Sequence, residues 1–109
     1  MSSFDDRQKA YEAKFIKDEE KLFKIRARRR KFLGLWAAEQ MHKNEEQCLE
    51  YALEIVKFGV GKRTTQEIAE KVMKDMQAAG VKVTLKEIED KLEQLTEKAA
   101  HSLEKEGVI

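Results

Sequence analysis

Residues 4–41 read FDDRQKAYEAKFIKDEEKLFKIRARRRKFLGLWAAEQM, and this stretch decides the fold of the chain. It contains no proline and a single glycine, Gly34, so it predicts one long helix with at most one hinge. At 100° per residue, one narrow apolar stripe runs along this helix. The stripe consists of Phe4, Tyr11, Phe15, Leu22, Leu33 and Trp36.

The two halves of the predicted helix differ in the width of this stripe. Between Phe4 and Phe15 it contains only aromatic side chains, and apart from small alanines nearly everything around it is polar or charged. Residues 17–21, KDEEK, are all charged, and beyond them the apolar face broadens as far as Met41. A narrow stripe fits a groove on a partner, whereas a broad one fits a bundle core.

We therefore expect residues 1–18 to be an N-terminal arm that probes another protein and residues 19–109 to form the bundle. An isolated helix as short as this arm is marginal in water, so the free arm can fray and then order on a partner. The expected partner contacts are Phe4, Asp5, Arg7, Tyr11, Lys14 and Phe15. The alternative is that the three aromatic residues fold back as an extra layer on the bundle.

The remainder of the chain predicts three shorter helices. Each begins with the spacing of a capping box, found at Asn44 with Gln47, Thr64 with Glu67, and Thr84 with Glu87. Glycines at 59, 61 and 80 stop the first two of these helices. The apolar face of the first helix is expected to comprise Cys48, Leu49, Ala52, Leu53, Ile55 and Val56. The fold class is therefore all-α, a small four-helix bundle with a long N-terminal helix or arm.

Composition narrows the functional classes. The chain has 109 residues, with 22 basic and 21 acidic side chains, which gives a net charge of +1 and no overall steering toward nucleic acid or anionic lipid. A single cysteine, Cys48, fits a reducing compartment and a small core position. No apolar run approaches the roughly 20 residues of a membrane span, and residues 1–6, MSSFDD, lack the basic and apolar regions of a secretory signal. We expect a cytoplasmic protein without direct membrane insertion.

The residues that could take part in catalysis or metal binding do not form a recognisable site. His42 and His101 belong to different elements, and no Cys or carboxylate residues lie around them at the spacing of metal ligands. No nucleophile is accompanied by a base and an orienting group. We expect no enzyme, no metal and no cofactor. The basic cluster at residues 26–31 leaves open an alternative, a nucleic-acid-binding module or a helical adaptor. Its side chains point around several helix faces, so no nucleic acid is expected. Arg29, close to the stripe, is expected to bind a carboxylate of another helix or of a partner.

Several short motifs along the chain carry a resemblance to a known family. They are FDDR at residues 4–7, YEAKF at 11–15, DEE at 18–20, FK at 23–24, ARR at 27–29, LGLWAAE at 33–39 and AAGV at 78–81. On these motifs the chain resembles the zeta-type inhibitor subunit of the F-type ATP synthase of alphaproteobacteria.

The resemblance implies a four-helix regulatory protein that acts at the cytoplasmic face of the inner membrane. Its N-terminal segment would enter the catalytic head between catalytic subunits, near the rotor, and block rotation in the direction of hydrolysis. The implied partners are therefore the catalytic and rotor subunits. The resemblance also implies weak adenine nucleotide binding, for which no residue of this chain is assigned.

Overall fold

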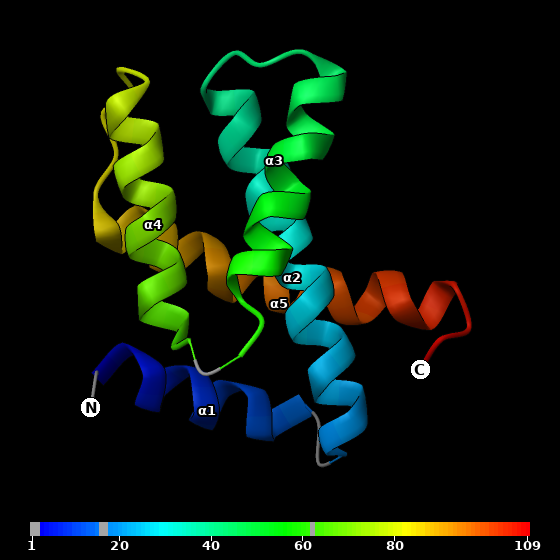
Figure 1. The fold of residues 1–109 in the computed structure, drawn as a ribbon. Coiled ribbons are helices and arrows are strands. Elements are labelled where there is room, and N and C mark those ends of the chain that lie inside the picture. Colours follow the sequence, from blue (N-terminus) through cyan, green and yellow to red (C-terminus); the bar gives the residue numbers. More distant parts are fainter. Residues whose placement is uncertain (1–2, 16–17, 62) are drawn as a thin grey trace.

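The computed structural model describes residues 3–15, 18–61 and 63–109, and these are helical with short connections (Figure 1). The helices are α1 (Ser3–Phe15), α2 (Glu19–Gln40), α3 (Glu45–Phe58), α4 (Thr65–Ala78) and α5 (Leu85–Lys105). No strand occurs in these ranges, which confirms the all-α class.

The helix expected over residues 4–41, with at most one hinge, is divided into two separate helices. Asp18 has an extended backbone, and its side chain accepts hydrogen bonds from the backbone N–H groups of Glu20 and Lys21, which makes it the N-cap of α2. Glu19 and Glu20 in the first turn also favour a helix start here, because carboxylates stabilise the positive end of the helix dipole. A new helix therefore begins within the charged run, and its axis departs from that of α1 (Figure 1).

The three predicted capping boxes are confirmed. In each, the cap side chain accepts the N–H of the residue three positions later, whose own side chain accepts the cap N–H; the pairs are Asn44 with Gln47, Thr64 with Glu67, and Thr84 with Glu87. Gly80, with a φ of 85°, follows α4 in a conformation that favours glycine. These local signals fix where α3, α4 and α5 begin.

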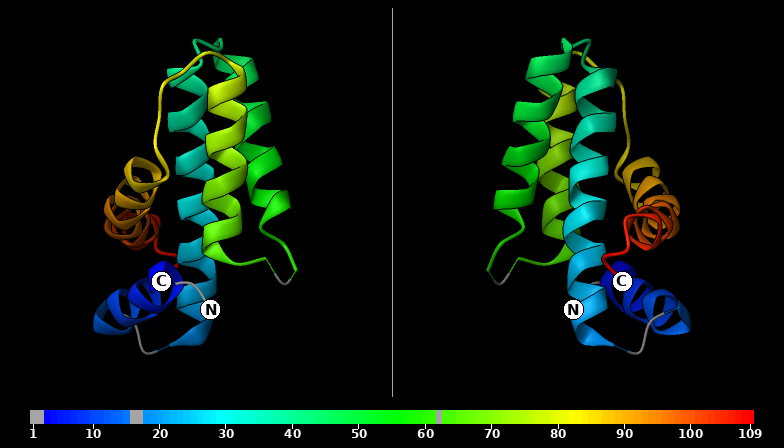
Figure 2. Two further views of the ribbon diagram at one scale, coloured as in Figure 1. Left: turned by 90° about the vertical axis from the view of Figure 1, so that its left-hand side faces the viewer. Right: turned by 90° about the vertical axis from the view of Figure 1, so that its right-hand side faces the viewer.

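Helices α2, α3 and α4 run side by side, whereas α5 crosses them and α1 lies across one end (Figures 1 and 2). Helices α2 and α3 approach each other closely at Gly34, where an added Cβ would lie 2.6 Å from the Cα of Ala52. The core between the helices includes Leu33, Ile55 and Val72. Trp36 packs against this core while remaining partly exposed, and Lys91 Nζ lies 5.3 Å from its ring centroid.

The predicted apolar face of α3 needs one correction. Leu49 and Leu53 are each 54% exposed, while Tyr51 is buried and its hydroxyl donates to Asp75 Oδ2 at 2.7 Å. Burial and this hydrogen bond raise the pKa of Tyr51. The face of α3 that meets the core is therefore rotated toward Cys48, Tyr51, Ala52 and Ile55, and an apolar strip is left facing solvent.

Candidate functional site

The side of α1 that meets the other helices is the candidate functional site. Phe4 is 2% exposed and belongs to the main hydrophobic core, together with residues of α4 and α5 such as Ile68 and Ile88. The guanidinium carbon of Arg7 lies 5.6 Å from the centroid of the Phe4 ring. In this conformation the first aromatic residue of the predicted arm is thus packed on the protein's own bundle.

Asp5 connects α1 to the start of α4. Its carboxylate Oδ1 accepts the backbone N–H of Gln66 at 3.3 Å, within the first turn of α4 after its cap, Thr64. The first N–H groups of a helix have no partner within it, and the helix dipole favours a negative charge beside them. Asp5, a predicted partner contact, therefore acts here as an anion bound at the N-terminus of α4.

Glu12 connects α1 to α2 and is 2% exposed. Its Oε2 accepts from Arg26, with the Nε at 2.9 Å and the Nη2 at 2.7 Å. Its Oε1 accepts from Arg29 Nη1 at 3.2 Å. The expectation that Arg29 binds a carboxylate from another helix is confirmed, and the carboxylate is that of Glu12.

Arg29 extends this contact to α5. It is 2% exposed, and its Nη1 also donates to Thr96 Oγ1 at 3.0 Å. The Thr96 hydroxyl in turn donates to the backbone oxygen of Leu92 at 3.0 Å. A buried polar chain therefore runs from α1 through α2 into α5.

The charges around this buried polar network explain why α2 needs a carboxylate partner here. Burial lowers the pKa of Arg29, the nearby charge of Glu12 opposes that effect, and Arg26 and Arg30 lower the pKa further. Arg30 has its own pKa lowered by burial and by Arg26. A cluster of arginines on α2 is thus partly balanced by one buried carboxylate that belongs to α1.

Arg7 adds an outer contact with α5. Its Nη2 lies 3.8 Å from Glu89 Oε1 and its Nη1 lies 3.9 Å from Glu93 Oε1, with the arginine side chain 57% exposed. Burial raises the pKa of Glu89, and the charge of Arg7 lowers it. Exposed pairs at such distances contribute at most about 1 kcal/mol, so Arg7 mainly orients α1 along α5.

The six predicted contact residues thus divide into two groups. Phe4 and Asp5 face the bundle, and Arg7 reaches α5. The side chains of Tyr11, Lys14 and Phe15 lie outside the described part of the structure. Glu12 is not among the partner contacts that the sequence analysis predicted.

The basic cluster at residues 26–31 is largely engaged within the protein. Arg26 and Arg29 bind Glu12, while Arg28 binds the carboxylate of Glu106 and donates to Ser102 Oγ at 2.9 Å. A surface that binds nucleic acid needs cationic side chains that are free to contact phosphate groups. The internal pairing of these arginines disfavours the nucleic-acid alternative.

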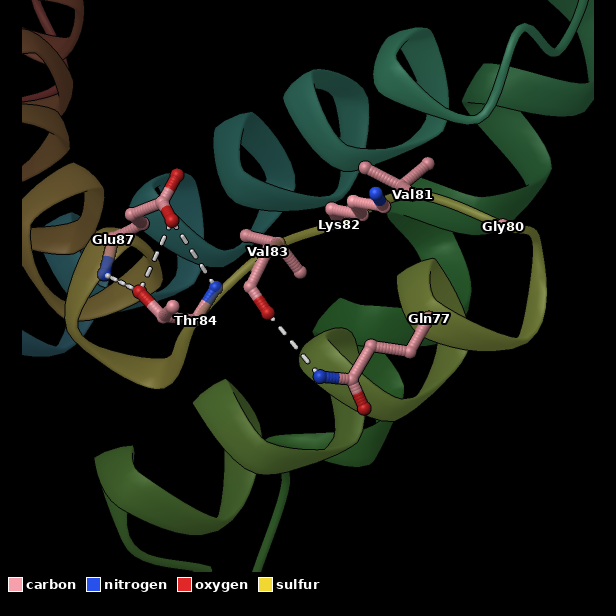
Figure 3. Close-up of a pocket in the computed structure, with 7 residues that line it drawn as sticks. All are labelled: Gln77, Gly80, Val81, Lys82, Val83, Thr84 and Glu87. Carbon is pink, nitrogen blue, oxygen red and sulfur yellow. Dashed lines mark hydrogen bonds between the residues drawn. The ribbon is translucent and has the colours of Figure 1, made fainter.

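The cavity beside the α4–α5 connection does not have a catalytic arrangement (Figure 3). Gln77 Nε2 donates to the backbone oxygen of Val83 at 3.2 Å, and Thr84 and Glu87 bind each other as the capping box of α5 (Figure 3). These polar groups hold the connector in place. Across the described residues, no group of three or more His, Cys, Asp or Glu side chains could hold a metal ion. Within the same residues, none of the helices has the length and apolarity to cross a membrane.

Comparison with known proteins agrees with the motifs along the chain. No curated protein sequence matches it. The family model described as ATPase inhibitor subunit zeta matches residues 1–102, from the first residue into the last turn of α5. This match covers nearly the whole chain and includes every contact that holds α1 on the bundle through Glu12 and Arg29. The chain therefore belongs to the ATPase inhibitor subunit zeta family.

Proposed function

We propose that this protein inhibits ATP hydrolysis by an F-type ATP synthase, and that α1 is the segment that enters the catalytic head and blocks rotation in the direction of hydrolysis. The observation that carries the proposal is that α1 is a separate helix: α2 has its own cap at Asp18. A segment built in this way can change its position without unwinding α2. Family membership supports an ATPase as the target.

In this proposal the docked position of α1 is the resting form of the inhibitor. Phe4, Asp5 and Glu12 make contacts with the bundle that a partner would have to replace. A ligand shifts such an equilibrium only by its difference in affinity for the two forms. The catalytic and rotor subunits would therefore bind the released α1, whose candidate contacts include Tyr11, Lys14 and Phe15 as well as Phe4, Asp5 and Arg7.

The energy of docking is compatible with release. Burying the Phe4 side chain contributes about 1.5–3 kcal/mol. The Asp5 hydrogen bond adds about 1.5–3 kcal/mol, since one partner is charged. Each of these contacts contributes only a few kcal/mol, an amount that contacts with a larger partner can replace.

The test is ATP hydrolysis by purified F-type ATP synthase from the source cell, freed of its own inhibitor. The full-length protein is expected to inhibit hydrolysis and to leave ATP synthesis unchanged, while a variant lacking residues 1–18 does not inhibit. The thermal unfolding of the truncated variant is measured in parallel, because Arg29 loses its carboxylate partner. Inhibition by both proteins would move the inhibitory site onto the bundle. Inhibition by neither would favour the adaptor alternative.

A further inference from the structure

An open apolar groove lies on the face formed by α2, α3 and the C-terminal residues, away from the contacts of α1. It has a volume of about 360 Å³. It is lined by Phe23, Lys24, Ala27, Arg28, Lys31, Val56, Leu103 and Val108. Phe23 is 70% exposed and Val108 is 42% exposed, so two large apolar side chains at this groove face solvent.

The walls of the groove are held in place by contacts behind them. Leu103 is 3% exposed and packs with Ile25 in a second hydrophobic cluster. Arg28 is fixed by the carboxylate of Glu106 and by Ser102 Oγ. The groove therefore exists before any partner binds, and a partner would not have to order its walls.

The charged residues that line the groove all have the same sign. Its lining contains three cations, Lys24, Arg28 and Lys31, and no carboxylate. Lys24 Nζ lies 3.6 Å from Glu20 in an exposed pair, which is weak enough to exchange for another partner. Lys31 is exposed and forms no ion pair within the described ranges, although its charge lowers the pKa of Glu106. Arg28 is already paired with Glu106, so Lys24 and Lys31 are the cations that the rim offers to carboxylates of a partner.

We propose that this groove binds an amphipathic helix of a partner protein, whose apolar side chains contact Phe23 and Val56 and whose flanking carboxylates pair with Lys24 and Lys31. The chemistry of the occupant is derived from the groove alone. The identity of the protein that presents the helix rests on the proposed function and is the F-type ATP synthase. The groove then attaches the bundle to the enzyme while α1 is engaged elsewhere.

A second copy of the chain fits this groove less well. A two-fold interface places the same patch of each copy against the other. The lysines of the two rims would then face each other, and like charges across an interface oppose association.

The first experiment measures the affinity of full-length variants for the immobilised, purified ATP synthase. Phe23→Ala is expected to weaken binding at least about tenfold, because an aromatic side chain is the main apolar anchor. Lys31→Glu is expected to weaken binding and to lower the association rate. The matched controls are Leu49→Ala, an exposed apolar residue outside the groove, and Lys74→Glu, an exposed lysine on α4; both are expected to bind like the parent protein.

Thermal unfolding of these variants separates binding from folding. Phe23 is 70% exposed, so its truncation is expected to leave the midpoint unchanged. If the parent protein binds and inhibits, and Phe23→Ala binds equally well, the groove proposal is wrong and the proposed function stands.

A second experiment tests the groove without the enzyme. Two fluorescent helical peptides carry the same leucine stripe, one flanked by glutamates and the other by lysines. The glutamate-flanked peptide is expected to bind the parent protein more tightly, and Phe23→Ala is expected to abolish the difference. If the parent protein neither binds nor inhibits the enzyme, the proposed function fails, and this peptide comparison alone decides about the groove. Equal binding of both peptides would overturn the proposal. So would binding to anionic vesicles that depends on Phe23, or self-association that depends on Phe23, if the protein shows no preference between the peptides.

Discussion

Replacing Glu12 by glutamine tests how α1 is held on the bundle. The substitution keeps the size of the side chain and removes the charge that binds Arg26 and Arg29. Removing one partner of a buried ion pair costs about 3–5 kcal/mol. Arg26 is 36% exposed and can regain water, so the lower end, about 3 kcal/mol, applies. This cost falls on the docking of α1, because undocking releases Glu12 from both arginines.

Amide hydrogen exchange resolved along the chain measures this effect directly. A loss of about 3 kcal/mol corresponds to roughly a hundredfold increase in the opening equilibrium, so the amides of α1 are expected to exchange about a hundredfold faster. The amides of α3 are expected to change little. Asp6→Asn is the matched control, since it converts an exposed carboxylate of the same helix into an amide. If Glu12→Gln has no larger effect on α1 than Asp6→Asn, the docked position of α1 does not depend on the charge of Glu12 and the reasoning is refuted.

The same variant links docking to the proposed function. If α1 must leave the bundle before it inhibits, a larger released fraction raises the apparent rate at which inhibition begins. Glu12→Gln is therefore expected to inhibit ATP hydrolysis with a faster onset than the parent protein. A slower onset together with faster exchange of α1 would show that the partner itself uses the Glu12 carboxylate.

Three further predictions concern other contacts. Phe4→Ala is expected to weaken α1 docking by roughly 3 kcal/mol, because a fully buried ring is lost; exchange in α1 measures it, and unchanged exchange contradicts it. Gly34→Ala is expected to lower the free energy of unfolding in urea by about 1–3 kcal/mol, since the new Cβ would lie 2.6 Å from the backbone of Ala52; an unchanged midpoint would mean that the helices move apart freely. Arg7→Ala is expected to raise the pKa of Glu89 further above its ordinary value, because the charge of Arg7 lowers it; NMR titration measures this. Since the folded pKa of Glu89 is raised, its contribution to stability is present at low pH and decreases as the pH rises through that pKa. A titration of Glu89 that does not respond would show that Arg7 lies elsewhere in solution.

Features set by a few consecutive residues could be predicted from the sequence. Asn44, Thr64 and Thr84 each lie three residues before a side chain that completes a capping box, so the starts of α3, α4 and α5 were readable without tertiary information. Asp18 followed by two glutamates carries a similar start signal. It was outweighed by the absence of proline and glycine around it, and the break between α1 and α2 was therefore anticipated only as an optional hinge.

The polar part of the candidate site depends on the direction of α1, which no local pattern specifies. Arg29 lies near the apolar stripe, and a charged residue in that position needs a counter-charge, so a carboxylate partner could be predicted. Which carboxylate reaches it depends on the turn between α1 and α2, and only the folded structure brings Glu12 beside Arg29. Asp5 is similar, because its partner, the N-terminus of α4, is 61 residues away in sequence.

The polar character of the α1 contacts suits a segment that is released under the proposed function. A buried ion pair such as that between Glu12 and Arg29 contributes little net stability, because the attraction is largely offset by the loss of water from both groups. When α1 leaves, the Glu12 carboxylate regains water, and this offsets part of the cost of release. A mismatched arrangement is costly, however, since it leaves one of these charges buried without its partner. The ion pair therefore specifies where α1 docks without holding it tightly, and Phe4 provides a limited apolar contact that a partner can replace.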